Sequence, residues 1–373
     1  MAIVTRSTTS EHNKLSSLPS DGPESLIPLT QLYHPPSPHK VHPRADWVIE
    51  QVRRWLYPHL KQLGAETLIK GIVNETASMC TYLYPNADDE GIFLATGFVT
   101  VQFDIFDSAA ILKAIQATPS GQRLARDLQK LRDTPQRMAN VPRGGFGLGD
   151  RSVPSGNYLQ SSTRMHIRGR HINEERFEVW LTKSCAAMKD FGKSHALIYS
   201  EAKNMTVEEY ADHKLRNSGM IYTVLFVEMA MGTFLSREHN AIPRTRQIQQ
   251  HSEKIGSLLN EIFSYEKETF LENTNNLLAV LVRTEKISLH EAAQRVGAMS
   301  QRHALEVKRI RIEIEAEYDH GSGEDVGLGT YVADMELFGA ACWFWQLQGT
   351  KRYCSKTSPF AELRLEGEDG KAE

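Results

Sequence analysis

The chain has 373 residues, of which 40% are hydrophobic and 24% are charged, and its formal charge is −3. A nearly neutral chain of this length can bury a large core, and its charge argues against a dedicated nucleic-acid binder. The four cysteines (Cys80, Cys185, Cys342 and Cys354) lack CxxC spacing, which argues against a zinc site or a disulfide framework. The sequence has no secretory-type apolar stretch and no run of 18 apolar residues, so we expect a cytoplasmic protein without a membrane span.

Composition divides the chain into three parts. Residues 1–45 are rich in Ser, Thr, Pro and His, which predicts a disordered arm. Residues 46–360 carry apolar side chains at helical spacing, which predicts one α-helical domain. Residues 361–373 form a polar tail.

Helical spacing predicts eight helices in chain order. They begin at Ala45 and then cover about 64–83, 89–107, 172–190, 206–236, 245–272, 287–318 and 326–348. The helix over 206–236 has a weak point at Asn217-Ser218-Gly219, where helix propensity is low. Because no stretch alternates as a strand would, the predicted class is all-α.

Residues 117–165 interrupt this pattern and are expected to form a flexible insert. The glycines at 143–149 resemble a GxGxxG motif and allow a helical nucleotide-binding protein as one hypothesis. No strand precedes them and no strong helix follows, so the context of a dinucleotide site is missing. A flexible loop is the favoured interpretation.

A row of three oxygen-bearing side chains is the most informative motif. Asn260, Ser264 and Glu268 follow one another at intervals of four residues, so they share one helix face, with Lys267 beside them. An amide, a hydroxyl and a carboxylate suit a hard cation such as Mg²⁺. Taken alone, the row is more simply interpreted as a solvated polar helix face.

Two aspartates form a second candidate for metal binding. Asp104 and Asp107 stand three residues apart near the end of the apolar helix over 89–107. Neighbouring carboxylates on an apolar helix repel each other and lose hydration, and a divalent cation would remove both penalties. A helix end that turns toward solvent is the simpler alternative.

Two further elements could bind an anion. Arg352-Tyr353 follows an aromatic helix segment, and arginine offers a rigid fork for phosphate oxygens. Arg216 precedes the weak point at residues 217–219, where a break would expose backbone groups to an anion. Each could also be an ordinary solvated arginine.

Together these motifs resemble the class I terpene synthases, in particular fungal and bacterial sesquiterpene cyclases, over about residues 45–355. Asn260, Ser264, Lys267 and Glu268 match NxxxSxxKE, and Arg352-Tyr353 lies where that family places this pair. Arg216 suits the family's diphosphate-sensing arginine, and Lys214 is a competitor for this role. The segment ISLHEA at 287–292 is similar to trichodiene-synthase-like members.

The chain departs from the family in two motifs. Glu261 replaces the Asp that usually follows the Asn, at a position that is not a ligand. The usual DDxxD or DDxxE is represented by Asp104 and Asp107 without an Asp-Asp pair, and either residue could be the leading ligand.

The resemblance implies an all-α, single-domain class I terpenoid synthase fold around a central active-site cavity. It implies Mg²⁺-dependent ionisation of farnesyl diphosphate, with three metal ions expected and Mn²⁺ possible, and cyclisation to a sesquiterpene. Geranyl or geranylgeranyl diphosphate, or a degenerate helical scaffold of the same fold, are the alternatives. The expected partner is the isoprenoid diphosphate, in a monomer or homodimer.

The resemblance also implies roles for individual residues. Metal would be held by Asp104, Asp107, Asn260, Ser264 and Glu268, and diphosphate by Arg216, Lys267, Arg352 and Tyr353. The expected pocket lining is aromatic, because π faces stabilise carbocations. Its candidates are Phe98, Phe103, Phe226, Phe263, Trp343 and Trp345.

Overall fold

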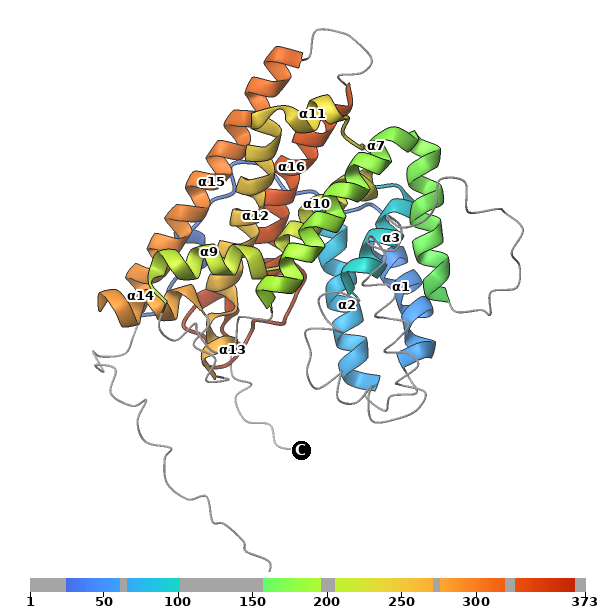
Figure 1. Ribbon diagram of the computed structural model, residues 1–373. Coiled ribbons are helices and arrows are strands. Elements are labelled where there is room, and N and C mark those ends of the chain that lie inside the picture. The colour runs from blue at the N-terminus through green and yellow to red at the C-terminus, as the bar shows by residue number, and fades with distance from the viewer. Residues whose placement is uncertain are drawn as a thin grey trace, which may run out of the picture.

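The computed structural model describes residues 25–60, 66–100, 157–195, 205–270, 276–318 and 326–365. Across these ranges the regular elements are helices, and strand-like pairing is limited to two isolated bridges, Ile27–Phe360 and Ser355–Arg364. The prediction of an all-α chain is therefore confirmed (Figure 1). None of the described helices is both long and apolar enough to cross a membrane.

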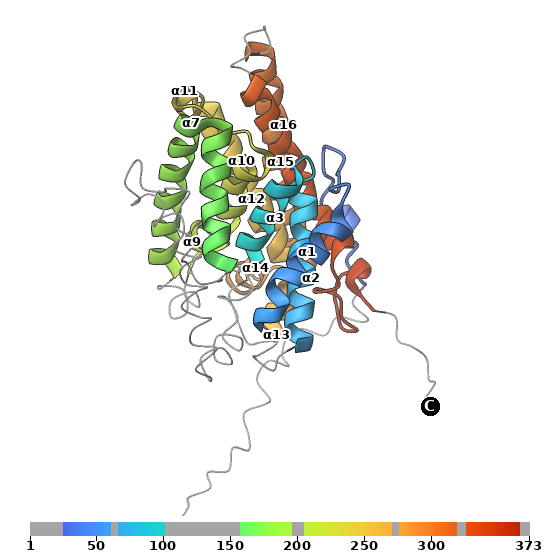
Figure 2. The ribbon, with the colours of Figure 1, turned by 90° about the vertical axis from the view of Figure 1, so that its right-hand side faces the viewer.

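The first three helices form one group. They are α1 (Ala45–Leu60), α2 (Glu66–Leu83) and α3 (Asp89–Thr100), and each packs against the other two. Figure 2 shows the three standing together on one side of the molecule. Almost every residue of α3 beyond its first turn is buried, as expected for a helix that is apolar around its circumference.

Helix α10 (Met220–Met231) occupies the interior, with residues 222–230 all buried. It packs against α3, α7 (Asn157–His195), α12 (Pro243–Phe263) and α16 (Val326–Phe344). Its contact with α3 is close, because a Cβ at Gly91 would lie 2.0 Å from the carbonyl oxygen of Ala230. Only glycine allows this approach of the two helices.

The weak point predicted at residues 217–219 is a real helix break. Helix α9 (Val207–Asn217) ends there and α10 begins after Gly219, which has a φ of 68°. That left-handed conformation suits glycine, so the chain changes direction at little cost. The single helix expected over 206–236 is thus two helices, followed by the short α11 (Arg237–Ala241).

The C-terminal half is built on long helices. Helices α12 (Pro243–Phe263), α15 (Leu289–Tyr318) and α16 (Val326–Phe344) pack against one another, and α16 continues into a π-helical turn over Trp345–Gly349. Two short helices, α13 (Tyr265–Phe270) and α14 (Leu277–Glu285), complete the order. The sequence pattern missed α14, which has only nine residues.

The start of α7 and the end of the expected N-terminal arm differ from the predictions. Helix α7 begins at Asn157, inside the segment expected to be irregular up to residue 165, and its backbone departs from helical geometry at Asn173. The chain over 25–44 also packs on the body, with Leu29, Leu32 and Tyr33 buried. Burial of these apolar side chains explains why residues 25–44, expected to belong to a disordered arm, pack on the body, and residues 1–24 of that arm lie outside the described part of the chain.

The two ends of the described chain pair with each other. The Ile27 amide donates to the carbonyl of Pro359 at 2.9 Å, and the Ala361 amide donates to the carbonyl of Ile27 at 3.0 Å. The Glu362 carboxylate accepts from the Leu29 amide at 2.8 Å. The polar tail expected from residue 361 therefore starts later, since Ala361–Leu363 is a short 3-10 helix with Leu363 buried.

Candidate functional site

The oxygen row spans the junction between α12 and α13. Asn260 lies in the last turn of α12, Ser264 caps that helix, and Glu268 lies in α13. Helical hydrogen bonds continue through the junction, because the Ser264 amide donates to Asn260 O at 2.8 Å and the Glu268 amide donates to Ser264 O at 2.9 Å. The three side chains therefore keep a common face although the helix expected over 245–272 is divided.

Neighbouring groups orient the first two members of the row. The Asn260 amide nitrogen donates to Tyr353 Oη at 3.1 Å and to Gln346 Oε1 at 3.3 Å. The Ser264 hydroxyl donates to Asn260 O at 2.7 Å. In both residues the hydrogen-bond donor is used within the protein, so the oxygen lone pairs are directed to other partners.

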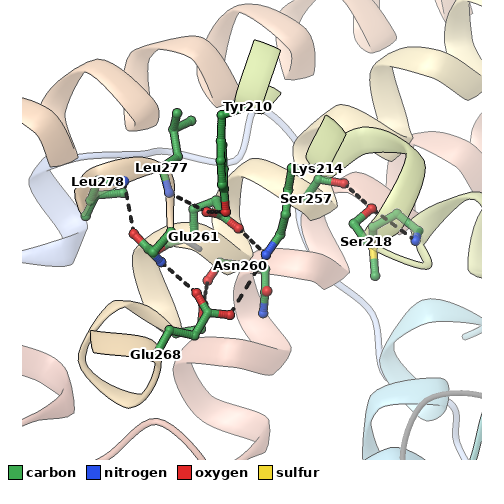
Figure 3. Close-up of polar contacts among 12 residues, drawn as sticks. Tyr210, Lys214, Ser218, Ser257, Asn260, Glu261, Glu268, Leu277 and Leu278 are labelled. Atoms are coloured by element: carbon green, nitrogen blue, oxygen red, sulfur yellow. Dashed lines mark hydrogen bonds and ion pairs between the residues drawn. The ribbon is translucent and has the colours of Figure 1, made fainter. Parts of the chain in front are cut away.

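Glu268 is held from two sides. Its Oε2 accepts from Asn276 Nδ2 at 2.9 Å, and its Oε1 lies 3.9 Å from Lys214 Nζ. Asn276 is fully buried, and its side-chain oxygen caps α14 by accepting from the Leu278 amide at 2.9 Å. The carboxylate thus has a defined orientation at the end of the row (Figure 3).

Lys214 reaches the row from α9 and forms a buried ion pair. Its Nζ lies 2.5 Å from Glu261 Oε1, and the Glu261 side chain is almost wholly buried. Burial alone would lower the pKa of Lys214, but the carboxylates of Glu261 and Glu268 outweigh burial and raise it. Lys214 is therefore a charged ammonium beside Glu268.

The structure describes the side chains of some of the remaining predicted polar residues and not of others. Lys267 and Arg352 are exposed, whereas Tyr353 is buried and contacts Asn260. Arg216 lies in the last turn of α9, and its side chain is outside the described part of the chain. Asp104 and Asp107 likewise lie outside the described residues, as does Phe103.

The predicted aromatic residues are all buried where they are described, and they form two clusters. Phe98 stacks on Phe226 with ring centroids 4.1 Å apart. Phe263 meets the edge of Trp343 at 5.2 Å, and Tyr353 meets the edge of Trp345 at 6.3 Å. The second cluster adjoins the oxygen row, since Phe263 is the last residue of α12 and directly precedes Ser264.

The donor set of the row fits a hard divalent cation. Within the described ranges no three or more His, Cys, Asp and Glu side chains are grouped so that they could hold a metal ion. The cysteine and histidine clusters that bind softer metals are therefore not among the described residues. The row instead offers one carboxylate and two neutral oxygens, and the Ser264 hydroxyl already uses its hydrogen-bond donor on Asn260 O. Such a set suits a cation that also keeps water and phosphate ligands.

Sequence reasoning missed the residues behind the row. Glu261, Tyr210 and Asn276 make the buried hydrogen bonds that support it, and none was a candidate. The sequence signal was present only at Glu261, a carboxylate placed among apolar neighbours on α12. Tyr210 and Asn276 lie on other helices, so spacing along the chain could not reveal them.

Comparisons with known proteins find a family whose matched region includes the row. A model of terpene synthase family 2, C-terminal metal binding, matches residues 125–304, which include the row. The chain is 26% identical over 348 residues to aristolochene synthase of Aspergillus terreus, covering 87% of this chain and 95% of that protein. It is 23% identical over 309 residues to 4-epi-cubebol synthase of Streptosporangium roseum, covering 81% and 86%.

A third match, to macrophomene synthase of Macrophomina phaseolina, is 31% identical over 122 residues but covers only 31% of this chain and 17% of that protein. Among solved structures, α-eudesmol synthase has a TM-score of 0.63 at 17% identity, covering 84% of this chain and 98% of that chain. Germacradien-4-ol synthase from Streptomyces citricolor has a TM-score of 0.61 at 18% identity, covering 86% and 99%. Both structures support the fold.

The family match over residues 125–304, the two long relatives and the shared all-α fold make the chain similar to the terpene synthases, and the oxygen row lies within the part that matches the family's metal-binding C-terminal model.

Proposed function

We propose that the protein is a class I cyclase that ionises farnesyl diphosphate with Mg²⁺ and closes the resulting carbocation to a sesquiterpene hydrocarbon or alcohol. The observation that carries the proposal is the row of Asn260, Ser264 and Glu268 with the Lys214 ammonium beside it. The relative from Streptosporangium roseum supports the choice of substrate, because its name describes it as farnesyl diphosphate cyclizing.

The chain's own residues would hold the metal and the diphosphate from several directions. Asn260, Ser264 and Glu268 would hold Mg²⁺ on one wall, and Asp104 or Asp107 on the opposite wall, with three ions in the full site and Mn²⁺ as a substitute. When bound, the metal supplies positive charge that stabilises the departing diphosphate.

Cationic side chains would bind the remaining phosphate oxygens. Lys214 is the strongest candidate on α9, because its ammonium lies 3.9 Å from a member of the row. Arg352, Lys267 and Arg216 remain candidates by position, and Tyr353 would donate a hydroxyl. A lysine binds phosphate as a point charge, whereas an arginine would fix the oxygens in a plane.

The apolar part of the substrate would meet aromatic faces. Phe263 lies between Asn260 and Ser264 in the chain, Trp343 packs against Phe263, and Trp345 packs against Tyr353. Their π faces would stabilise the cation once the C–O bond breaks, and their burial would keep water from quenching it early. Phe98 and Phe226 would line the pocket farther along α3 and α10.

The test is incubation of the purified protein with Mg²⁺ and, separately, geranyl, farnesyl and geranylgeranyl diphosphate, followed by gas chromatography–mass spectrometry. We expect a sesquiterpene from farnesyl diphosphate that requires the metal. Product from another chain length alone would replace the proposed substrate. The lack of any terpene from all three substrates would contradict the proposal and favour a degenerate scaffold of the same fold.

A further inference from the structure

We infer that Glu261 is a positioning residue that fixes the Lys214 ammonium at the edge of the diphosphate site, an inference that rests on the proposed function. Glu261 touches neither metal nor substrate in this role. It acts through Lys214, which it holds with its Oε1, 2.5 Å from Nζ.

The first observation is how the fully buried Glu261 carboxylate is held by the groups on its Oε2 side. Glu261 Oε2 accepts from the Tyr210 hydroxyl at 3.0 Å and from the Leu277 amide at 2.6 Å. Burial and the nearby negative charge of Glu261 raise the pKa of Tyr210, so the phenol stays protonated and donates. These donors leave the carboxylate one orientation, which fixes the position of Oε1.

The second observation is where Lys214 points. Its ammonium has three donors, and the contact with Glu261 uses one of them. The side chain keeps 20% of its surface exposed, and Nζ lies 3.9 Å from Glu268 Oε1. The lysine therefore presents its other donors to the row and to whatever binds there (Figure 3).

The third observation links the lysine to the metal-facing residues. Asn276 Nδ2 donates both to the backbone carbonyl of Glu261 at 2.8 Å and to Glu268 Oε2 at 2.9 Å. The same buried network therefore places Glu268 and, through the Glu261 side chain, Lys214. Because Lys214 and Glu268 share this support, the distance between the ammonium and the carboxylate stays constant. A diphosphate that contacts both the lysine and the metal on Glu268 needs such a fixed distance.

Buried ion pairs add little to stability compared with apolar residues of similar size, and removal of one partner is strongly destabilising. A structural role alone would therefore also make Glu261→Gln harmful. The chain offers a matched pair that separates the two roles. The buried Glu228 pairs with Lys183 at 2.5 Å and accepts from the Leu235 amide at 3.0 Å, between α7 and α10.

The experiment measures binding of inorganic diphosphate in the presence of Mg²⁺ by isothermal titration calorimetry, without any turnover. Glu261→Gln and Lys214→Ala should each weaken binding about tenfold or more, because a charge-assisted contact is lost or displaced. The double variant should bind no more weakly than Lys214→Ala. Glu228→Gln should bind like the parent protein even where it lowers the melting temperature.

Additive losses in the double variant, or an equal loss in Glu228→Gln, would overturn the positioning role. Helical content by circular dichroism comes first, and Glu261→Asp and Tyr210→Phe replace Glu261→Gln if that variant does not fold. The aspartate keeps the charge but draws the carboxylate back by one methylene. It should weaken diphosphate binding only while Lys214 is present, and an equal loss in the Lys214→Ala background would contradict the inference.

Turnover separates this inference from the proposed function. If the parent protein makes no terpene but binds diphosphate with the expected coupling between Glu261 and Lys214, the positioning role stands and the cyclase proposal fails. If the parent protein makes a sesquiterpene while the two substitutions act independently on diphosphate binding, the proposed function stands and the positioning role fails.

Discussion

Asn260 and Tyr353 are joined by a hydrogen bond of 3.1 Å from the amide nitrogen to the phenol oxygen, although 93 residues separate them in the chain. This contact brings the end of α12 together with the segment that follows α16. It also determines which atom of Asn260 remains for a metal, because an amide that donates through its nitrogen directs its oxygen elsewhere.

Tyr353→Phe should weaken metal binding without changing the fold. The variant removes one of the two oxygens that accept from the Asn260 amide nitrogen, so Gln346 alone holds the amide and its oxygen is directed less firmly. The loss of one hydrogen bond of this kind is worth about 1 kcal/mol, which corresponds to an increase of about fivefold in the Mg²⁺ concentration for half-maximal turnover. A Mg²⁺ titration of product formation measures it.

Tyr331→Phe is the matched control for that experiment. The buried Tyr331 hydroxyl also accepts from a side-chain amide, that of Gln249, at 2.8 Å. Its removal should lower stability by a similar amount and leave the Mg²⁺ dependence unchanged. A shift of the same size in both variants would show that Tyr353 acts through general stability.

Asn260→Ala and Glu268→Ala should each abolish turnover while circular dichroism shows unchanged helical content. Each removes an oxygen from the row and leaves the helical backbone intact, since alanine is a good helix former. Thr269→Ala, on the next residue of α13, is the control for local disturbance and should keep most of the activity. Wild-type rates in either row variant would mean that the row does not hold metal.

The two aspartates proposed as further metal ligands need their own comparison. Asp104→Asn and Asp107→Asn, made separately, should reduce activity to different degrees, because neutralising a leading carboxylate ligand removes both charge and coordination. We expect the true ligand to show the larger rise in the Mg²⁺ requirement. Identical and unchanged titration curves would exclude both aspartates as ligands.

The parts of this site that the sequence predicted are the local ones. Asn260, Ser264 and Glu268 share a face because four-residue spacing and helical geometry suffice to place them. The weak point before α10 was also local, because glycine propensity marks it. The pair of Lys214 and Glu261 depends on how α9 packs against α12, and no periodic pattern along the chain encodes that contact.

The N-terminal segment is a second case in which the sequence alone did not predict a tertiary contact. Its composition predicted disorder up to residue 45, yet Tyr33 is buried with its ring 5.1 Å from that of Trp343. A few apolar side chains in a Pro- and Ser-rich segment can be buried if a surface elsewhere in the chain accepts them. Such a surface belongs to tertiary structure, so composition could not predict it.

Glu253→Gln should stabilise the protein at alkaline pH. Burial raises the pKa of Glu253 from 4.5 to about 7, which the Lys254 charge only partly opposes. Because the folded state binds the proton more tightly, this residue makes stability fall as pH rises from about 4.5 through 7. The variant should gain about 1–3 kcal/mol of unfolding free energy at pH 8.

Urea unfolding at several pH values measures the effect of Glu253→Gln, and the gain should shrink toward pH 5, where the glutamate is protonated in the folded state. Glu291→Gln, at an exposed position on α15, is the control and should show no such pH dependence. A gain that stays constant from pH 5 to pH 8 would argue against a titrating Glu253.

His303→Asn should reduce the sensitivity of the fold to acid. His303 on α15 lies with its Nδ1 2.8 Å from Nδ1 of His251 on α12. Burial, then His251 and the charges of Lys254 and Arg302, lower the pKa of His303 from 6.5 to about 4, and Glu306 opposes them weakly. The neutral imidazole is therefore the form that the helix interface accepts.

The sign of this effect follows from proton uptake. Between about pH 6.5 and 4 the unfolded chain protonates His303 and the folded chain does not, so the unfolding free energy falls as pH decreases. The parent protein should lose about 1–3 kcal/mol more than His303→Asn over that range, because asparagine can occupy the Nδ1 position without titrating. His171→Asn, at an exposed position on α7, should follow the parent curve. Parallel curves for the parent and His303→Asn would place the acid sensitivity in other residues, since α12 and α15 would then meet equally well with either side chain.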